Sequence, residues 1–514
     1  MKKKCLWVGL LALSTTLLVS CSASTPNDVT LTTTPGVCVS SLKSNYEVSA
    51  SSYYPYNAFP INAYMPASSP YCMAVTITNN NTGENANNVQ VYQNGLTLAY
   101  TIESTTYTSS MVDYNAAGLS SGNFYNTTTQ QLANIALFDP NNCVTTIGAN
   151  VNTISKNGEQ CTFFLQLVSE SMPVGDLSLT LNVNYTNGND NYNVSTNIYE
   201  HTVLYAGGTF TEPANYLALY HSGSSAESLG YSLPQNMNAI KLLAKDILGN
   251  DYAYDGTNVF QFNGESIILT NGSPANINSF SWDGQGHVFA ATTNGLYVYN
   301  AASGNSATWN IVNGESSGYI SSVQAFESAP NNVLYIANSN GIESCAFANN
   351  TCLPNLVYSA SGTVNNGALQ ANIQESQIAW ASGSNIYRNS NPLSLASGSF
   401  LESGTIGLDM LNGLYFANAA GIFEPAVYYN VFGQTQIQPL LDANNNSLYG
   451  RSNGILLRSY SIASNSLMTL YTYGSIFSNG AYLAYLPLLA GNSYTASGTW
   501  TGIAGFNQTV NSTV

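Results

Sequence analysis

Strict alternation of apolar and polar residues marks the clearest element of the chain, between residues 177 and 198. Five apolar residues fall on one side of an extended chain: Leu177, Leu179, Leu181, Val183 and Tyr185. A turn region with Asn187 and Gly188 follows, and Tyr192, Val194 and Ile198 then resume the period of two. Because successive side chains of a strand point to opposite faces, the pattern predicts a β-hairpin with one buried face.

The segment before this hairpin carries the same signal in shorter pieces. Met73, Val75 and Ile77 alternate with polar residues, a polar turn follows, and Val89 and Val91 begin another strand. Residues 103–140, rich in Thr, Tyr and Asn, lack a clear period and look like an insertion. We expect residues 38–200 to form a β-sandwich.

A different pattern recurs through residues 201–514. Each copy is an apolar-aromatic strand with a small residue, followed in most copies by a Gly or Asn turn and a second apolar strand. The copies begin at Val203, Asp251, His287, Val333, Gln377, Gly413 and Ser447, with a partial one at Ala481. Their spacing of roughly 34 to 48 residues suits the four-stranded blades of a β-propeller.

Propeller geometry explains the residues of this recurring pattern. Inner strands crowd around a central axis, so we expect small residues there, as at Ala290, Ala337 and Ala417. Turns are expected at Asn294-Gly295, Asn340-Gly341 and Asn453-Gly454. A blade gains a core only by stacking on its neighbours. The sequence therefore predicts an all-β chain with a propeller of about seven blades over 201–514, closed by residues after 480.

Several phrases resemble known families. "CMAVTITNNNTGENANNVQV" and "GEQCTFFLQL" are similar to bacterial immunoglobulin-like domains of surface proteins. This resemblance covers about residues 70–200 and implies that the sandwich expected over residues 38–200 is immunoglobulin-like. "HVFAATTNGLYVYN" resembles the repeat of propellers on two-component sensors, and "LYAGGTF" that of cell-surface propellers. These likenesses imply a fold and leave the ligand open.

The N-terminus resembles a bacterial lipoprotein signal. Lys2, Lys3 and Lys4 precede an apolar run, and "LVSC" ends at Cys21, with Ser22 next. We expect a signal peptide over residues 1–20, lipidation of Cys21, a tether over 21–37 and an outer-membrane location, on either the surface or the periplasmic face. An ordinary secretory signal is the alternative. An uncleaved anchor would need about 20 apolar residues, more than this run offers.

Composition narrows the function classes. Only 7% of residues are charged, 44% are hydrophobic and the formal net charge is −16. Seven cations lie outside the signal: Lys43, Lys156, Lys241, Lys245, Arg388, Arg451 and Arg458. Such a chain repels phosphate backbones, so nucleic acid is excluded as a partner.

Six cysteines remain after Cys5 and Cys21 are set aside, and an even number in an exported chain indicates disulfides. Local spacing favours Cys345–Cys352, with Asn349 and Asn350 turning a hairpin, and Cys143–Cys161. Cys38 and Cys72 are then left as the third pair. Fifteen pairings are formally open. Zinc is the rival reading, but no histidine lies near these cysteines.

Catalytic groups are scarce. The histidines are His201, His221 and His287, and no nucleophile, phosphate-loop or dinucleotide motif accompanies them. Asp251, Asp255, Asp283 and Asp442 lie near expected turns. In propeller hydrolases such as lactonases, similar residues hold a divalent cation, but turn capping explains them without a metal. We therefore predict no catalytic residues, no metal and no cofactor.

A binding surface is the remaining candidate. Tyr53, Tyr54, Tyr56 and Tyr64 crowd one stretch, and Tyr, Asn and Ser suit protein or glycan contacts. Plain polar coverage of a charge-poor surface is the alternative. The leading hypothesis is a non-enzymatic envelope lipoprotein, attached to the membrane at Cys21, that binds protein or glycan ligands through its propeller face. An outer-membrane assembly scaffold and a metal-dependent propeller hydrolase are the alternatives.

Overall fold

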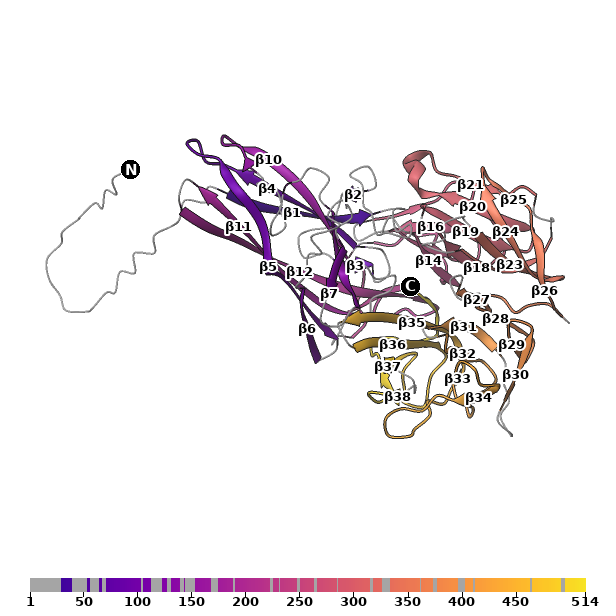
Figure 1. Cartoon of the computed structure of the whole chain (residues 1–514). Helices are drawn as coiled ribbons and strands as arrows, with labels where there is room; N and C mark the ends of the chain where they lie inside the picture. Colours follow the sequence, from indigo (N-terminus) through magenta and orange to yellow (C-terminus); the bar gives the residue numbers. More distant parts are fainter. Residues whose placement is uncertain are drawn as a thin grey trace.

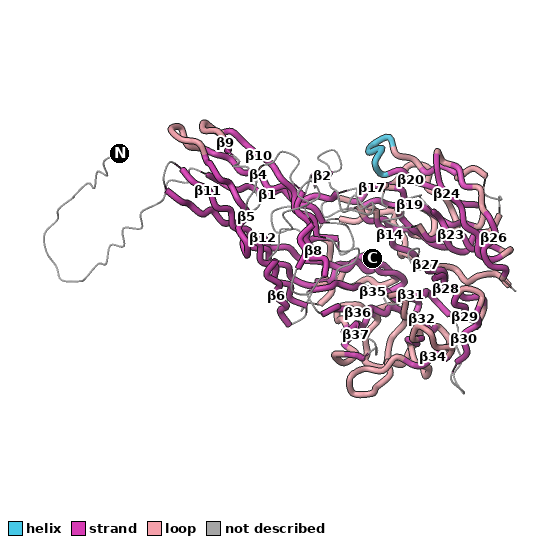
Figure 2. Tube along the Cα trace, in the orientation of Figure 1, coloured by secondary structure: helices cyan, strands magenta, loops and turns pink. Residues whose placement is uncertain are grey.

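The computed structural model describes residues 29–38, 53–55, 64–66, 71–102, 105–111, 123–126, 131–138, 143, 153–167, 174–187, 190–221, 225–230, 232–246, 250–262, 266–283, 285–314, 318–325, 333–360, 362–372, 377–395, 403–409, 412–462, 465–490 and 495–514. In some strands only the backbone is described. Most of the described residues lie in β-strands joined by loops and turns (Figure 2), with one 3₁₀ segment, η3 (Ala301–Ser306). They include no helix with the length and apolarity required to span a membrane.

Two sheets make up the N-terminal half (Figure 1). The first has the order β2-β1-β4-β10-β8-β7, with β1 (Val29–Cys38), β2 (Tyr53–Pro55), β4 (Tyr71–Asn79), β7 (Asn123–Asn126), β8 (Gln131–Phe138) and β10 (Glu159–Leu167). The second has the order β13-β12-β11-β5-β6, with β5 (Ala86–Ile102), β6 (Thr105–Met111), β11 (Gly175–Asn187), β12 (Asp190–Gly208) and β13 (Leu217–His221). Three further strands pair with its members, namely β3 (Tyr64–Pro66), β9 (Thr153–Ile154) and β40 (Val510–Thr513).

The predicted hairpin is confirmed as β11 and β12. Val183 lies opposite Val194 and Tyr185 opposite Tyr192. Leu181, Val183 and Tyr185 are buried, and the two tyrosine rings stack with centroids 5.4 Å apart. One face of this long ladder therefore contributes to the core, as the alternation indicates.

Two N-terminal expectations need correction or completion. Residues 29–37, expected in the tether, form most of β1, which pairs with β4 along its length. The run of β-branched threonines favours a strand here, and Pro35-Gly36 does not interrupt it. Residues 103–140 supply β6 to one sheet and β7 and β8 to the other, so this segment extends both sheets.

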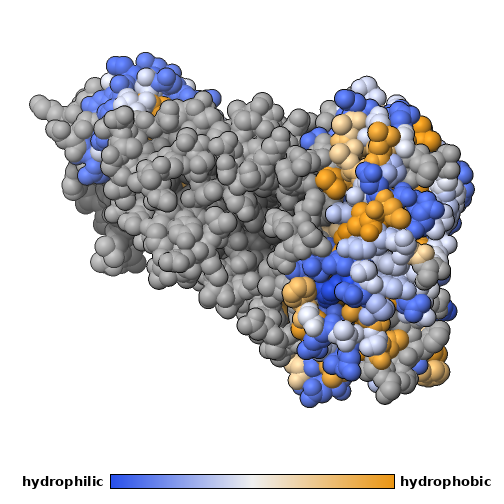
Figure 3. Space-filling view, turned by 45° about the vertical axis from the view of Figure 1, so that its right-hand side comes forward, coloured by the Kyte–Doolittle hydropathy of each residue, from blue (hydrophilic) through white to orange (hydrophobic). Residues whose placement is uncertain are grey.

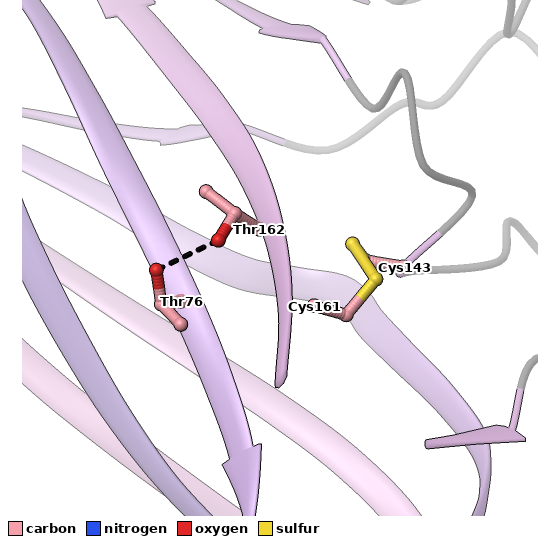
Figure 4. The surroundings of a disulfide bond; sticks show 4 residues. All are labelled: Thr76, Cys143, Cys161 and Thr162. Atoms are coloured by element: carbon pink, nitrogen blue, oxygen red, sulfur yellow. Dashed lines mark hydrogen bonds between the residues drawn. A yellow bond between two sulfur atoms is a disulfide. The ribbon is translucent and has the colours of Figure 1, made fainter. Parts of the chain in front are cut away.

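A disulfide joins Cys143 to Cys161, as expected from their spacing (Figure 4). Cys161 lies in β10, and beside it the hydroxyls of Thr76 and Thr162 hydrogen-bond at 2.8 Å across the β4–β10 pair. The bond therefore ties the segment that contains Cys143 to a central strand of the first sheet. The side chains of Cys38 and Cys72 lie outside the described residues, so their pairing stays a prediction.

Five sheets follow along the chain. The first three comprise β14 (Leu242–Lys245), β15 (Asp251–Tyr254), β16 (Val259–Phe262) and β17 (Ile267–Leu269); β18 (Ile277–Trp282), β19 (His287–Thr292), β20 (Gly295–Asn300) and β21 (Trp309–Ile311); and β22 (Ile320–Gln324), β23 (Val333–Asn338), β24 (Gly341–Ala348), β25 (Thr351–Cys352) and β26 (Asn355–Ser359).

The fourth sheet has eight strands, because a parallel pair between β30 and β34 joins two four-stranded units. The units are β27 (Leu369–Asn372), β28 (Gln377–Ser382), β29 (Asn385–Arg388) and β30 (Asn391–Leu395), then β31 (Ser403–Leu408), β32 (Leu414–Asn418), β33 (Val427–Asn430) and β34 (Gln436–Pro439). The last sheet comprises β35 (Ser452–Ile462), β36 (Asn465–Gly474), β37 (Leu483–Ala490), β38 (Thr495–Ala496) and β39 (Thr501–Gly502).

The first strands of these units form a closed ring. Each contacts the next in the order β14, β18, β22, β27, β31 and β35, and β40 contacts both β35 and β14. β40 also pairs with the second half of β12. The C-terminal strand therefore closes the ring against a strand that begins in the N-terminal half, which is the arrangement of a β-propeller.

Apolar clusters fill the spaces between neighbouring units, and each described cluster of the ring draws on two of them. Phe289 of one unit packs with Leu334 of the next, and Tyr415 packs with Leu470. Leu204, beside β13, packs with Tyr471 of the last sheet. Each unit thus buries both of its faces only through its neighbours, as expected from the repeat.

The small residues of the repeat have a different reason from the expected one. Ala290, Ala337 and Ala417 are fully buried, but they lie in β19, β23 and β32, the second strands of their units. They belong to the clusters between neighbouring sheets. Close packing of sheet on sheet, and not crowding around the axis, explains them.

Two repeat copies fall on other strands of their unit than the remaining copies do. The copy at Ser447 leads into β35, a first strand, so Asn453-Gly454 lies inside a strand and forms no hairpin turn. The partial copy at Ala481 precedes β37, the third strand of the same sheet. The second strand there is β36, which the phrase did not reveal.

The expected disulfide hairpin is present. Cys345 and Cys352 are bonded, and Asn349 and Asn350 between them have φ of 50° and 60°. Asparagine tolerates these left-handed angles better than most residues, which explains the pair at the turn.

β12 joins the two halves without a linker. It pairs with β11 as far as Thr202 and with β13 from Val203, so the expected boundary between residues 200 and 201 falls inside one strand. The Thr202 hydroxyl accepts a hydrogen bond from Gly175 N at 2.7 Å and donates to Gly175 O at 3.0 Å. β12 therefore passes from pairing with β11 to pairing with β13 within one continuous sheet.

Removal of residues 510–514 should open the ring. Two buried valines and the β12 pairing would be lost, so we expect the free energy of unfolding to fall by about 3–5 kcal/mol or more. Ser512→Ala keeps the strand and removes the side-chain hydrogen bonds to Leu243 N and to the Tyr473 hydroxyl, so it should cost about 1–2 kcal/mol. Thermal denaturation followed by circular dichroism measures both. Equal melting temperatures for the truncated and intact chains would contradict closure by β40.

Candidate binding face and buried charge cluster

Three of the four singled-out aspartates cap turns. Asp255 Oδ1 accepts hydrogen bonds from Thr257 N and Asn258 N, at 2.8 and 2.7 Å. Asp283 Oδ1 accepts from Gln285 N and His287 N, both at 2.9 Å. Asp442 Oδ1 accepts from Asn444 N and Asn446 N, at 2.8 and 2.9 Å. Carboxylates in these positions satisfy turn amides that would otherwise lack partners.

Two more aspartates do the same and were not singled out from the sequence. Asp246 Oδ1 accepts from Asn250 N at 3.0 Å, and Asp409 Oδ1 accepts from Gly413 N at 2.7 Å. A signal was present in the sequence, because in each case the donor stands four residues after the aspartate. Asp283 with His287 and Asp442 with Asn446 share this spacing.

Two of the three histidines lie beside acidic side chains. His287 Nδ1 lies 2.7 Å from Asp283 Oδ2, and its ring meets that of Phe347 edge-on at 5.3 Å. His221 Nε2 lies 3.2 Å from Glu227 Oε1 at the surface. The side chain of His201, in β12, is outside the described residues. Within the described residues, no three His, Cys, Asp or Glu side chains are grouped so that they could hold a metal ion.

Asp251 differs from the other aspartates, because it lies in β15 and caps no turn. It stands opposite Lys245 in the β14–β15 ladder. Together with Asp246 and Arg458 they form the charge cluster, in which no residue is more than 2% exposed. The charge cluster thus takes two of the few cations of a charge-poor chain out of water.

Neighbouring side chains organise the cluster. The Tyr252 hydroxyl donates to Asp246 Oδ2 at 2.7 Å, and Lys245 Nζ lies 4.7 Å from the centre of the Trp282 ring. Burial raises the pKa of Asp251 well above its ordinary value; the positive charges of Lys245 and Arg458 oppose the rise, and Asp246 adds to it. Burial is therefore the dominant influence on this carboxyl group.

The charge cluster lies at the end of the ring nearest the N-terminal sheets. Lys245 is the last residue of β14. The first strand of each unit runs in the same direction as β40, so the last residues of all these strands lie at the same end of the ring. The last residue of β40's segment, Val514, exchanges backbone hydrogen bonds of 3.0 and 2.9 Å with Tyr205, where β12 enters the ring. We call the opposite end of the ring, where the first strands begin, the open end.

At the open end, three connections form one hydrogen-bonded surface. They are residues 418–426, 440–451 and 474–482. Gly450 N donates to Glu424 O at 3.1 Å, and Ala426 N donates to Leu448 O at 2.7 Å. Tyr449 N donates to Ser478 Oγ at 3.2 Å, and Ser478 N donates back to Tyr449 O at 2.8 Å. The central connection is thereby fixed to both of its neighbours.

Large apolar side chains are exposed on this surface. We define the loop patch as Ile422, Phe423, Leu441, Tyr449 and Ile476, which are 55%, 85%, 41%, 44% and 50% exposed. These connections therefore expose large apolar side chains among their Asn and Ser residues. Figure 3 shows that hydrophobic residues interrupt the hydrophilic surface in several places on the described part of the C-terminal half.

The tyrosines that the sequence suggests as a binding surface lie elsewhere in the chain. Tyr53, Tyr54 and Tyr64 lie in β2 and β3, and their side chains are outside the described residues, as is all of Tyr56. The loop patch was missed, although "AAGIFEP" places two large apolar residues between Gly and Pro in a connection. Cys21 also lies outside the described residues.

Comparisons with known proteins give only distant structural likenesses. No family model matches the chain, and no curated protein matches it. A Bacteroides thetaiotaomicron auxiliary nutrient binding protein is similar at 9% identity over 80% of this chain and 96% of its own, with a TM-score of 0.34. YCF48 bound to D1 peptide is similar at 14% identity over 51% of this chain and 85% of its own, with a TM-score of 0.35.

An extracellular domain assigned to a one-component system of B. thetaiotaomicron is similar at 14% identity and a TM-score of 0.37; it matches 62% of this chain and 44% of its own. This chain therefore spans less than half of that structure. Structural likenesses this distant carry no information about the ligand of this protein.

The stability of the protein should carry a pH dependence that comes from Asp251. Its pKa is raised in the folded state, so the folded chain holds this proton more tightly than the unfolded chain. The stability contributed is present below the unfolded pKa of about 3.9 and is lost as pH rises through the folded pKa. Asp251→Asn removes this titration, so the melting temperature of the variant minus that of the native protein should increase as pH rises from 4 to 8. A difference that stays constant with pH would contradict the assignment.

Proposed function

We propose that the protein is a non-enzymatic binding protein of the bacterial cell envelope, built as an immunoglobulin-like sandwich followed by a seven-bladed propeller. The blade count is supported by the ring of first strands β40, β14, β18, β22, β27, β31 and β35. The sandwich is supported by two sheets that each have a buried face and by the Cys143–Cys161 bond. β12 serves both parts.

The proposed attachment is a lipid at Cys21 after removal of residues 1–20. The motif "LVSC" after an apolar run supports it. Described structure begins at Val29, so few residues separate the proposed anchor from β1. The lipid would hold the folded body at the outer membrane, with the open end of the ring available for partners.

The binding role rests on one observation, the exposure of the loop patch and of Phe423 above all. Large apolar side chains exposed on connections that contact one another mark interaction sites more often than plain surface does. The three connections that carry the patch are hydrogen-bonded to each other, so little ordering would be needed on binding. The patch has the character of a preformed contact.

A protein is the partner that fits the loop patch. Ile422, Leu441 and Ile476 have no hydrogen-bonding side-chain groups, so they gain from contact with another apolar surface. Covering an exposed phenylalanine is worth about 1.5–3 kcal/mol. Arg451 lies beside the patch, with its Nε donating to Ala419 O at 2.9 Å, and adds a polar edge. An apolar centre with a polar rim is typical of protein interfaces.

A metal-dependent hydrolase has less support, because Asp255, Asp283 and Asp442 are used as turn caps. The assembly-scaffold hypothesis shares the same binding surface and differs only in the partner. A periplasmic partner would favour the scaffold, and an external one would favour adhesion.

Phe423→Ser should weaken partner binding. A photoreactive amino acid at position 423 in intact cells would capture the partner, and the same residue at position 268 would serve as a background control. Titration calorimetry with the purified partner should show at least a tenfold loss for Phe423→Ser, or about 1.4 kcal/mol. Ile268→Ser removes an aliphatic residue of equal exposure to Ile422 from β17, and it should leave the affinity unchanged. Equal affinities for all three proteins would refute the loop patch as the contact.

Cys21→Ala should release the protein from the membrane. Labelling with a fatty acid analogue and cell fractionation measure the lipid and the location. Cys5→Ala is the matched control and should keep both, because Cys5 lies within the proposed signal peptide. Lipid labelling that persists in Cys21→Ala would show that the anchor has been assigned to the wrong residue.

A further inference from the structure

A chain of uncharged polar side chains crosses three neighbouring units at the open end of the ring. The Tyr319 hydroxyl donates to Asn366 Oδ1 at 2.6 Å, and Asn366 Nδ2 donates to Asn278 Oδ1 at 3.2 Å. Asn278 Nδ2 in turn donates to Ile320 O at 2.7 Å. We call Asn278, Tyr319 and Asn366 the amide group.

The position of the amide group follows from the strands. Asn278 is the second residue of β18, Tyr319 directly precedes β22, and Asn366 lies shortly before β27. All three strands are members of the ring, and their first residues lie at its open end. The group therefore borders the axis at the end opposite the charge cluster.

A second uncharged group lies across the ring. The Tyr473 hydroxyl hydrogen-bonds with Thr405 and Ser512, which belong to β31 and β40. Gly454 makes this reach possible, because a Cβ at that position would clash with the Tyr473 hydroxyl. Burial raises the pKa of Tyr473 to about 12, so the phenol stays protonated at physiological pH.

Both groups differ in chemistry from the other end of the ring, but Tyr473 and Ser512 are buried, so only the amide group can contact a ligand. The two groups consist of hydroxyls and amides only, whereas the opposite end holds two carboxylates and two cations. An anionic ligand needs cationic partners, and neither group contains one. A purely apolar ligand would shield the second N–H of the Asn278 and Asn366 amides from water without replacing that hydrogen bond, at a cost in free energy. The composition fits a neutral ligand rich in hydroxyls.

The hydrogen bonds within the amide group leave further donors and acceptors that can bind such a ligand. The second N–H of Asn366 Nδ2 and that of Asn278 Nδ2 can each donate, and the Tyr319 oxygen can accept. The internal bonds fix the orientation of these groups before binding. Tyr319 is 37% exposed, so part of its ring offers an apolar face to the C–H groups of a sugar.

We propose that the open end of the ring binds an uncharged carbohydrate through Asn278, Tyr319 and Asn366. This inference extends the proposed binding function by placing a second ligand class at the same end of the ring. It uses residues outside the loop patch, so either proposal can fail while the other stands.

The experiment is titration of the full-length protein, in a detergent without a sugar headgroup, with neutral oligosaccharides. The probes are hexasaccharides of glucose in α-1,4 and β-1,4 linkage, of mannose, and of N-acetylglucosamine, with a galacturonic acid hexamer as the acidic comparison. We expect at least one neutral probe to bind and the acidic hexamer not to bind. Asn366→Ala should weaken that binding at least tenfold, and Tyr319→Phe should weaken it about threefold, because only one hydroxyl is lost.

Controls separate this proposal from folding defects and from the loop patch. Asn355→Ala changes an exposed asparagine on β26 and should leave binding unchanged. Phe423→Ser should also bind the sugar normally. Tyr319→Phe keeps the aromatic ring, so it remains informative if Asn366→Ala fails to fold. Absence of binding to every neutral probe, preference for the acidic hexamer, or native affinity in both amide-group variants would overturn the proposal.

Discussion

The pairing of β40 with β12 is the constraint on which the C-terminal half depends. Each unit of the ring has two apolar faces, and a stack of such units is stable only if no face is left without a neighbour. The clusters that join Leu204 to Tyr471 and Val203 to Leu243 complete the circle on either side of the closing sheet. That sheet is assembled from both ends of the ring's sequence, so its core is the last to form in any order of folding that starts from one end.

Local patterns in the sequence predicted much of this fold. The β11–β12 hairpin followed from a period of two, and the repeat gave the all-β class and the spacing of the units. The first strands were the least visible. They carry hydroxyls such as Ser279, Ser281 and Ser512, whose oxygens accept hydrogen bonds from the neighbouring first strand at 2.8 to 3.1 Å. Because polar hydrogen bonds join these strands, a search for apolar repeats does not detect them. The apolar second strands were therefore mistaken for the inner strands.

The features of the candidate site also divide into those that could be predicted from the sequence and those that could not. Turn capping by Asp255, Asp283 and Asp442 was predictable, because it depends on residues two to four positions away. The charge cluster was not, since Asp251 and Arg458 come from strands far apart in the sequence that only ring closure brings together. The loop patch is an intermediate case: "AAGIFEP" was visible, but its exposure depends on how three separate connections lie against each other.

The course of β12 through both halves has a mechanical consequence. A hinge would let the ring turn freely about the N-terminal sheets, but a strand with partners along its whole length resists both bending and twisting. Force applied between the N-terminal region and the ring would load the β11–β12 ladder in shear, with many hydrogen bonds sharing the strain at once. The N-terminal sheets therefore fix the orientation of the ring. A ligand bound at the open end would transmit force directly to these sheets, because no flexible joint lies between them and the ring.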